Sequence, residues 1–422
     1  MITGDESTIG HPNACPKVDI AHCSSCLVVY LAAYPFRVGS LAVTMTALHH
    51  PFSDLGMRDP YPLLAAIRRT RPAWFDKSMG MWLLTSHQLC RMTLRDPSFS
   101  AAQGQQQRVR SDDLPISMLN TDGDLHRRLR TPAAAVFTAK AASSRTDEIR
   151  AQARTVLAAL PPTGAGRNID VVSAISAPFA VAVLGLVTGV PRSRWPELGE
   201  LAAAASANLN PVLRGEQAAA AATAATALQK FLGRHAREIL KSDADLSAGE
   251  RLGILSLIVV GGYEPLADLC STALSLILDT PSAPDRLRAG GPEAYARAVD
   301  EAMRLESPIP FTSRVCVGGY RTDSVDIPPG APVLAMLGAA NRDPAVFDDP
   351  DTFVLDRTPN VHLALGGGVH YCLGAAIVKQ STATLLAELL GSRPGIVREP
   401  GSASPWRQTL VPRGLSALPV RW

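Results

Sequence analysis

Long segments rich in alanine, leucine and arginine are the feature of this sequence that most constrains its fold. These residues are strong helix formers, and apolar residues recur within the segments at roughly the 3.6-residue period of a helix with one buried face. The segments span residues 64–71, 134–159, 197–208, 215–241, 248–278 and 374–390, whereas short β signals are confined to 81–85, 314–317 and 333–337. A chain of 422 residues can bury a large core, so the sequence predicts a mainly α domain with a small β portion.

Charge and cysteine content exclude several classes of protein. The net charge is only +3 and the 41 basic residues are scattered, which does not suit nucleic-acid binding. The most apolar N-terminal stretch, residues 27–42, is interrupted by Pro35 and Arg37 and falls short of the roughly 20 apolar residues of a membrane span. Seven cysteines, an odd number without disulfide-framework spacing, indicate a reducing compartment. We therefore expect a cytoplasmic protein that binds neither nucleic acid nor membrane.

The first 44 residues differ from the rest of the chain. They contain three of the seven cysteines, Cys15, Cys23 and Cys26, and show no clear helical period. A single CxxC without a second pair is a weak zinc signal, and the simpler interpretation is a loose tail or translated sequence upstream of the true start. We therefore expect residues 1–44 to be a disordered or misassigned extension and residues 45–422 to form one domain.

Residues 362–376 place a cysteine after a glycine-rich loop and before a predicted helix. Helix N-terminal N–H groups and the helix dipole favour a thiolate at Cys372. Gly366, Gly368 and Gly374 allow the backbone to approach a large flat group. A phosphate cradle is disfavoured because no dinucleotide-binding pattern accompanies the loop. From this local pattern alone, an inert buried cysteine remains an alternative.

This segment resembles the haem-binding loop of cytochrome P450 enzymes, Phe-Gly-x-Gly-x-His-x-Cys-x-Gly. Leu365 replaces the usual aromatic residue and Gly367 stands where bacterial members often have histidine; the matching positions are Gly366, Gly368, His370, Cys372 and Gly374. The resemblance implies a P450 fold that binds haem b, with Cys372 as the axial thiolate ligand of the iron.

Two further segments strengthen the resemblance. Glu301 and Arg304 match the family's ExxR motif, and their spacing places both side chains on one helix face. Residues 347–357 resemble the loop that packs beside that pair in the family, which implies that Arg357 contacts it. An ExxR pattern alone would more often be an ordinary surface ion pair.

The resemblance also implies partners for the haem propionates. His126 and Arg130 match the family's HxxxR helix, Arg314 matches the arginine that follows the ExxR helix, and His370 matches the loop histidine. Alone, His126 and Arg130 would more often be part of a solvated helix face, whereas Arg314 among apolar neighbours would need a partner if buried.

The predicted helix 248–278 resembles the family's oxygen-binding helix, with one departure. Gly261, Gly262 and Glu264 match (Ala/Gly)-Gly-x-(Asp/Glu)-Thr, but Pro265 occupies the threonine position. In the family that hydroxyl orders water and assists protonation of dioxygen. Proline has no N–H and frees the Gly261 carbonyl, so we expect a kink at the two glycines. By resemblance Glu264 and Pro265 are the catalytic positions; alternatively, this is a kinked core helix in which Glu264 only caps or pairs.

The family implies oxidation of a small organic molecule with dioxygen and external electron donors. We expect tailoring of a secondary metabolite, by hydroxylation or by oxidative aryl or C–C coupling, for instance of a cyclic dipeptide. No flavin or iron–sulfur module accompanies the domain, which implies a ferredoxin and a ferredoxin reductase, and a monomeric enzyme. An acidic partner would suit the surface near Arg127, Arg128 and Lys379.

Polar residues suggest where a substrate could be bound. The segment 101–108 contains four glutamines and Arg108, and with Ser206, Asn208 and Asn210 it offers hydrogen bonds to a polar substrate; a solvated loop is the alternative.

Three other functions stay open: a peroxide-driven peroxygenase, a non-catalytic haem sensor or carrier, and a haem-free structural protein. Peroxygenases of the family also carry proline at position 265, but after arginine rather than after glutamate.

Overall fold

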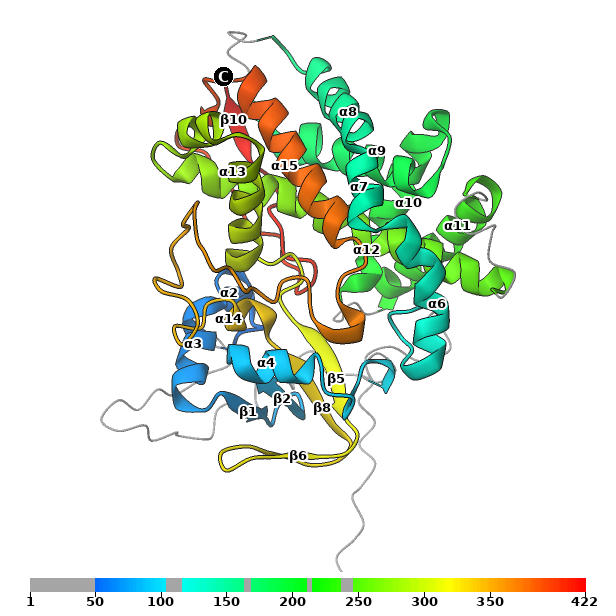
Figure 1. Ribbon diagram of the computed structural model, residues 1–422, viewed down its shortest axis with the longest axis vertical. Coiled ribbons are helices and arrows are strands. Elements are labelled where there is room, and N and C mark those ends of the chain that lie inside the picture. Colours follow the sequence, from blue (N-terminus) through cyan, green and yellow to red (C-terminus); the bar gives the residue numbers. More distant parts are fainter. Residues whose placement is uncertain (1–49, 104–115, 163–167, 211–214, 237–245) are drawn as a thin grey trace, which may run out of the picture.

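A computed structural model describes residues 50–103, 116–162, 168–210, 215–236 and 246–422. The predictions for residues 1–44, including Cys15, Cys23 and Cys26, fall outside these ranges, as does most of the glutamine-rich segment. The described chain is mainly helical with a small β portion (Figure 1), as predicted.

The helices form the larger part of the molecule and surround one long helix, α12 (Ala248–Asp279). The capping box of Ser247 and Glu250 fixes the start of α12. The helices packed on α12 are α9 (Ala177–Thr188), α10 (Trp195–Ser206), α11 (Gly215–His235), α13 (Ala283–Leu305) and α15 (Ala375–Ser392), and α8 (Thr146–Ala158) packs on α9 and α15. Among the described helices, α12 alone is long and apolar enough to cross a bilayer, but over half of its most apolar window is buried in the fold, as in a core helix.

The main sheet has the order β1-β2-β8-β5-β3 and lies at the other end of the molecule from most of the helices. Strands β2 and β8 are parallel and the other neighbours are antiparallel. The strands are β1 (Ala73–Asp76), β2 (Met81–Leu84), β3 (Phe99–Ser100), β5 (Thr312–Cys316) and β8 (Ala331–Ala335). Smaller sheets join β4 (Ile169–Asp170), β10 (Pro419–Arg421) and β9 (Val397–Arg398), and β6 (Tyr320–Arg321) with β7 (Asp326–Ile327). Short helices beside the main sheet are α2 (Asp54–Arg58), α3 (Tyr61–Thr70), α4 (His87–Thr93) and α14 (Leu337–Ala340).

The prediction of one helix over residues 134–159 is wrong. This region contains the end of α6 (Gly123–Val136), then α7 (Ala139–Ser144) and α8. Thr138 is extended and its hydroxyl accepts a hydrogen bond from the N–H of Ala141, which starts a new helix. Helix propensity alone does not reveal such a cap, because the residues on both sides of it are good helix formers.

Helix α12 continues through Pro265 without interruption. The bend expected at Gly261 and Gly262 therefore does not end the helix. Because Pro265 lacks an N–H, the Gly261 carbonyl has no donor at the fourth residue along the helix. This free carbonyl is part of the site described next.

Candidate active site

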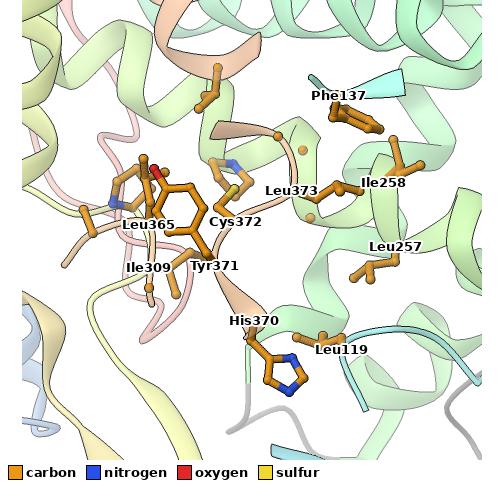
Figure 2. Close-up of a pocket in the computed structure, with 18 of the residues that line it drawn as sticks. Leu119, Phe137, Leu257, Ile258, Ile309, Leu365, His370, Tyr371, Cys372 and Leu373 are labelled. Atoms are coloured by element: carbon orange, nitrogen blue, oxygen red, sulfur yellow. The ribbon is translucent and has the colours of Figure 1, made fainter. Parts of the chain in front are cut away.

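A cavity of about 340 Å³ lies between α12 and the loop that carries Cys372. Figure 2 shows Leu365, Tyr371, Cys372 and Leu373 of the loop together with Leu257 and Ile258 of α12 around it. Most of the lining is apolar, and the remaining wall residues include Met118, Leu119, Val183, Leu184, Val187 and Ile309. The polar side chains in the lining are Arg130, Thr312, Arg314, His370, Tyr371 and Cys372.

The cysteine loop has a shape that depends on glycine. Gly366 and Gly368 have φ of 71° and 64°, values that side chains with a Cβ rarely adopt. A Cβ at Gly368 would also lie 2.2 Å from the carbonyl oxygen of Leu94. The N–H of Cys372 donates to the carbonyl of Leu365 at 2.9 Å, so the loop folds back on itself and presents Cys372 to the cavity.

Burial raises the pKa of the Cys372 thiol, and this outweighs the lowering effect of the Gly374 N–H and of Arg130. The lowering effect expected of the helix N-terminus is present, but burial outweighs it. A coordinated metal ion deprotonates a thiol that its surroundings leave protonated. Cys372 is suited to a metal ligand rather than to a free nucleophile.

His126 and His370 lie close together beside the cavity. Their ring centroids are 4.3 Å apart, and Nε2 of His370 is 3.1 Å from Oδ1 of Asp122. Nε2 of His126 is buried without a hydrogen-bond partner among the described residues. Burial, together with the charges of His370 and Arg130, lowers the pKa of His126 to about 4. Nε2 of His126 is therefore placed to donate a hydrogen bond to an acceptor or an anion that the described residues do not supply.

Two arginines complete this polar group. Arg314 is buried on β5, where Nη1 donates to the Ser313 carbonyl at 2.7 Å and to Thr312 Oγ1 at 3.0 Å. Burial lowers the pKa of Arg314 to about 10, and among the described residues no carboxylate forms an ion pair with it. Arg130 on α6 donates to the Tyr371 carbonyl at 2.5 Å. A buried guanidinium without a counter-ion is costly.

These residues fit haem b. The cavity places the Cys372 sulfur beside apolar walls. Among the described residues, Nε2 of His126 has no hydrogen-bond partner and Arg314 has no ion-pair partner. Both side chains therefore suit anions such as the two propionates. The structure brings together the five predicted haem-binding residues: Arg130, Arg314, His370 and Cys372 line the cavity, and His126 contacts His370. Sequence reasoning missed Asp122, the acid that holds His370 and precedes the predicted His126 helix.

Of the two predicted catalytic residues, only Pro265 reaches the cavity. Leu257, Gly261, Pro265 and Leu269 recur every four residues along one face of α12 and line it. Glu264 is not among the lining residues, because it is rotated by about 100° around the helix from Pro265. Burial raises the pKa of Glu264, and the charge of Arg407 opposes this effect. A proton-handling role for Glu264 thus stays a prediction.

Two of the polar residues proposed to bind substrate, Ser206 and Asn208, form hydrogen bonds within the protein instead. The buried Ser206 hydroxyl donates to the Val260 carbonyl of α12 at 3.4 Å. The Asn208 amide donates to the carbonyls of Ala205 and Ala221, at 2.9 and 2.8 Å, and so ties α10 to α11. Both residues stabilise the wall of the cavity.

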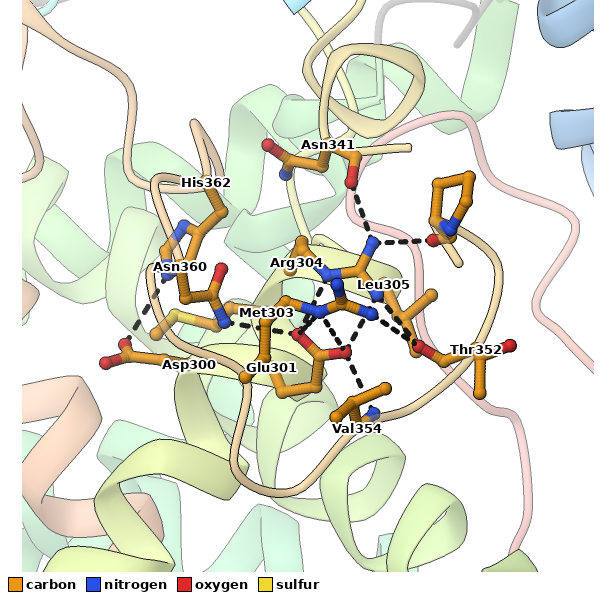
Figure 3. Close-up of polar contacts among 12 residues, drawn as sticks. Asp300, Glu301, Met303, Arg304, Leu305, Asn341, Thr352, Val354, Asn360 and His362 are labelled. Atoms are coloured by element: carbon orange, nitrogen blue, oxygen red, sulfur yellow. Dashed lines mark hydrogen bonds and ion pairs between the residues drawn. The ribbon is translucent and has the colours of Figure 1, made fainter. Parts of the chain in front are cut away.

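The ExxR pair forms a buried cluster beside the segment that leads into the cysteine loop (Figure 3). Nε and Nη2 of Arg304 each donate to a Glu301 oxygen at 2.8 Å, and Nε of Arg357 donates to the same carboxylate at 3.0 Å. The Glu301 and Arg304 side chains have no exposed surface. Asn360 and the N–H of Val354 also donate to Glu301. The predicted Arg357 contact is confirmed, and the cluster holds the segment that leads into the cysteine loop.

Comparisons with known proteins agree with this site. The family profile "Cytochrome P450" matches residues 295–392. The chain is 31% identical over 403 residues to nocardicin C N-oxygenase of Nocardia uniformis subsp. tsuyamanensis, covering 88% of this chain and 98% of that protein. It is 28% identical to the cytochrome P450 monooxygenase PikC of Streptomyces venezuelae, covering 89% and 96% of the two chains.

Solved structures show the same fold. The P450BioI structure in complex with an acyl carrier protein carrying hexadec-9Z-enoic acid superposes with a TM-score of 0.78 at 26% identity, covering 87% of this chain and 99% of that one. The tirandamycin C-bound P450 monooxygenase TamI superposes with a TM-score of 0.77 at 27% identity, covering 87% and 98%. This chain is a member of the cytochrome P450 family, an oxygenase that binds haem b through a cysteine thiolate.

Proposed function

We propose that this P450 oxidises a small, mainly apolar secondary metabolite that carries its own N–H or O–H groups. The observation that carries the proposal is the α12 wall of the cavity, where Gly261 and Pro265 lie among apolar side chains and proline cannot donate to the Gly261 carbonyl. Relatives with tailoring roles in their names, such as nocardicin C N-oxygenase, support a place in secondary metabolism. A tryptophan-containing cyclic dipeptide is one molecule with these properties.

Bound haem b supplies dioxygen activation and one-electron chemistry. The chain supplies the surroundings: Cys372 would ligate the iron, and the polar group of Arg314, Arg130 and His126 would hold the propionates. The apolar residues of α12 and α9, such as Leu257 and Leu184, exclude water and orient the substrate. Confinement of the substrate against this wall limits which of its atoms can react.

Proton supply in this pocket differs from that of a P450 with a threonine hydroxyl. Position 265 offers neither a hydroxyl nor an N–H, while the carbonyl of Gly261 can accept a hydrogen bond from water or from a substrate N–H or O–H. Proton transfer needs a donor within hydrogen-bond reach, directly or through one water. The substrate's own polar groups then become part of the proton path.

An acidic electron-transfer protein, a ferredoxin with its reductase, is the proposed electron source. The cations first expected to receive it are paired within the chain: Arg127 with Asp124, Arg128 with Glu250, and Lys379 with Asp300. Arg91 and Arg95 remain without an ion pair in the described ranges, and both line a surface hollow beside Gly367 and Tyr371 of the cysteine loop.

The two arginines are exposed, and so are the neighbouring apolar residues Val369 and Tyr371. A basic rim beside apolar side chains suits docking of an acidic partner close to Cys372. We further propose that the enzyme acts as a cytoplasmic monomer. The bacterial origin of the relatives supports the cytoplasmic part of this proposal.

The substrate proposal is tested with pairs of candidate substrates that differ only in N- or O-methylation. The haem-loaded enzyme, ferredoxin, reductase and NADPH are combined with each compound, and product, consumed NADPH and released peroxide are measured. We expect methylation to raise the share of electrons lost as peroxide several-fold while the dissociation constant changes little. Equal coupling for both members of every pair would contradict the proposal. Product masses separate hydroxylation, which adds one oxygen, from coupling, which joins two units with loss of two hydrogens.

Pro265 also favours a second candidate, a peroxide-driven peroxygenase, because a pocket without the threonine relay gains less from reductive oxygen activation. Faster turnover with hydrogen peroxide alone than with NADPH and redox partners would support this candidate. Pro265→Thr is the matched variant. It should keep haem binding and shift electrons from peroxide release towards hydroxylated product if the enzyme uses dioxygen.

A further inference from the structure

Asp122 lies where several separate parts of the site meet. It directly precedes α6, the helix that carries His126 and Arg130. Its backbone is extended, and its side chain caps no N–H of that helix. The carboxylate instead accepts hydrogen bonds from the end of β3, from the residues that follow β3, and from the cysteine loop. It therefore has a different task from that of an ordinary helix cap.

On one side, Asp122 holds a segment that forms part of the cavity wall. Oδ2 accepts hydrogen bonds from the Ser100 hydroxyl at 2.6 Å and from the Ala102 N–H at 3.0 Å. Oδ1 accepts a weaker one from the Ala101 N–H at 3.3 Å. Ala101 is buried and lines the cavity. Because these donors lie 20 to 22 residues before Asp122 in the chain, the carboxylate fixes a contact between distant segments.

The residues directly before Asp122 line the same cavity. The Thr121 hydroxyl donates to the Ser117 carbonyl at 2.9 Å and closes a turn over residues 117–121. Met118 and Leu119, within this turn, belong to the cavity lining. The two wall segments, one around residue 101 and one around residue 118, are therefore joined at Asp122.

On the other side, Asp122 holds the polar group that suits the haem propionates. Nε2 of His370 donates to Oδ1 at 3.1 Å, and the His370 ring lies at the edge of the cavity (Figure 2) against that of His126. Burial lowers the pKa of Arg314, and the charge of Asp122 opposes this effect. Arg314 lies on β5, which pairs with β3 at Ser100. The acid thus acts on the haem side of the cavity as well as on its wall.

Oδ1 of Asp122 is shared between the two sides. It accepts from Nε2 of His370 and from the N–H of Ala101, while Oδ2 accepts from Ser100 and Ala102. Hydrogen bonds to an ionised carboxylate are roughly twice as strong as neutral ones, and bonds that share one group influence each other. A shift of the wall segment therefore moves the oxygen that orients the His370 ring, and the reverse also holds.

We propose that Asp122 is a positioning residue that couples retention of the haem to the shape of the cavity wall. By holding His370 it sets one of the side chains that suit a propionate, and by holding Ser100 and Ala102 it sets Ala101 on the wall. Weakening either contact should therefore impair both haem retention and binding of ligands that touch the wall. The proposal goes beyond the proposed function, because it needs neither the substrate class nor the proton path.

The test uses two probes and two measurements on the haem-loaded ferric protein. Imidazole binds the iron alone, whereas the phenyl group of 4-phenylimidazole also reaches the apolar walls. The ratio of their dissociation constants, from absorbance titrations, reports on the wall. The rate at which haem passes to excess apomyoglobin reports on haem retention. Neither measurement depends on turnover.

Two substitutions each change one side of the carboxylate. Ser100→Ala removes a donor on the wall side, and His370→Phe keeps a ring but removes the partner on the haem side. Groups that share one partner are coupled. We therefore expect Ser100→Ala to speed haem transfer, and His370→Phe to reduce the preference for 4-phenylimidazole, each at least about twofold. Asp122→Ala should worsen both measurements by about tenfold, as expected for loss of hydrogen bonds to a charged group.

The decisive result is the behaviour of these cross-effects without the carboxylate. In an Asp122→Ala background, Ser100→Ala should no longer change haem transfer and His370→Phe should no longer change the ligand preference. Asp122→Asn keeps the size of the side chain but has one acceptor oxygen, so it should lose the cross-effects too. Asp124→Asn is the matched control, because this acid of the same helix is 94% exposed and pairs only with Arg127 at the surface. Both measurements should keep their wild-type values in this control.

Cross-effects that are missing from the wild-type background, or that persist after Asp122→Ala and Asp122→Asn, would overturn the proposal. Equal changes in Asp124→Asn and Asp122→Asn would overturn it as well. If substrate is oxidised normally but no cross-effect is seen, the coupling is wrong and the proposed function stands. If the cross-effects appear as expected but no candidate substrate is oxidised, the proposed function fails alone.

Discussion

Replacing Glu301 by glutamine removes the carboxylate that Arg304 and Arg357 share in the buried cluster on α13, while it keeps the size of the side chain. Glu301 accepts hydrogen bonds from Arg304 and Arg357, and the Glu301 and Arg304 side chains have no exposed surface. The variant leaves two guanidinium groups, one fully and one largely buried, with a neutral partner. Removing one member of a buried ion pair costs about 3–5 kcal/mol, a large share of the roughly 5–15 kcal/mol by which a domain is stable.

The assay is urea unfolding of the haem-loaded protein, followed by far-ultraviolet circular dichroism and by haem absorbance. Glu293→Gln is the matched control, since the same substitution on the same helix affects a side chain that is 92% exposed. We expect the control to change the unfolding free energy by less than about 1 kcal/mol. The reasoning would be refuted if Glu301→Gln and Glu293→Gln destabilised the protein equally. It would also be refuted if Glu301→Gln unfolded at the wild-type urea concentration.

Three other predictions concern the surroundings of the cysteine loop. Gly368→Ala should lower the haem-to-protein ratio of the purified protein, because its φ is 64° and its Cβ would lie 2.2 Å from a backbone carbonyl; wild-type loading would contradict this. Although burial alone would raise the pKa of Asp300, hydrogen bonds from a histidine and a lysine lower it. The stability advantage of wild type over Asp300→Asn should therefore be present above pH 3.8 and be lost as the pH falls below this value. Urea unfolding that gives an equal difference at pH 7 and pH 3 would refute this assignment. Arg91→Glu and Arg95→Glu should slow stopped-flow reduction by an acidic ferredoxin at low salt at least several-fold and more than Arg127→Glu; equal effects would argue for a different docking face.

Local motifs predicted the haem side of this site because each of them is short and has a fixed spacing. The cysteine loop, the ExxR pair and the arginine that contacts it could be identified in the sequence, and the structure places Arg357 on Glu301 as expected. The arrangement of Arg314 and His370 around one cavity also follows from motif positions. Such residues are constrained by the group they surround, which makes them recognisable without knowledge of the full fold.

Contacts between distant segments could not be predicted in this way. Arg407 and Asp268 are 139 residues apart, and nothing in either local sequence indicates the other. The ion pairs that occupy Arg128 and Lys379 depend on Glu250 and Asp300, which approach only through tertiary packing. The cap at Thr138 was hidden for a different reason, because good helix formers flank it on both sides.

The pKa of Cys372 shows how tertiary packing can outweigh a local effect that the sequence indicates correctly. A helix N-terminus lowers the pKa of a cysteine thiol, but here burial has the larger effect and raises it. The burial arises from the packing of the cavity walls, which the local sequence does not describe. The thiolate is therefore expected only with a metal bound to the sulfur.

The central claim is that Cys372 is the axial ligand of the haem, and the reduced carbon monoxide difference spectrum tests it most directly. The wild-type protein should show the red-shifted absorption band of a thiolate-ligated haem. Cys372→Ala should lose that band and all substrate oxidation, while Cys270→Ala, which changes a buried cysteine on α12, should keep both. A thiolate band that persists in Cys372→Ala, or that is missing from the wild-type protein, would contradict the account.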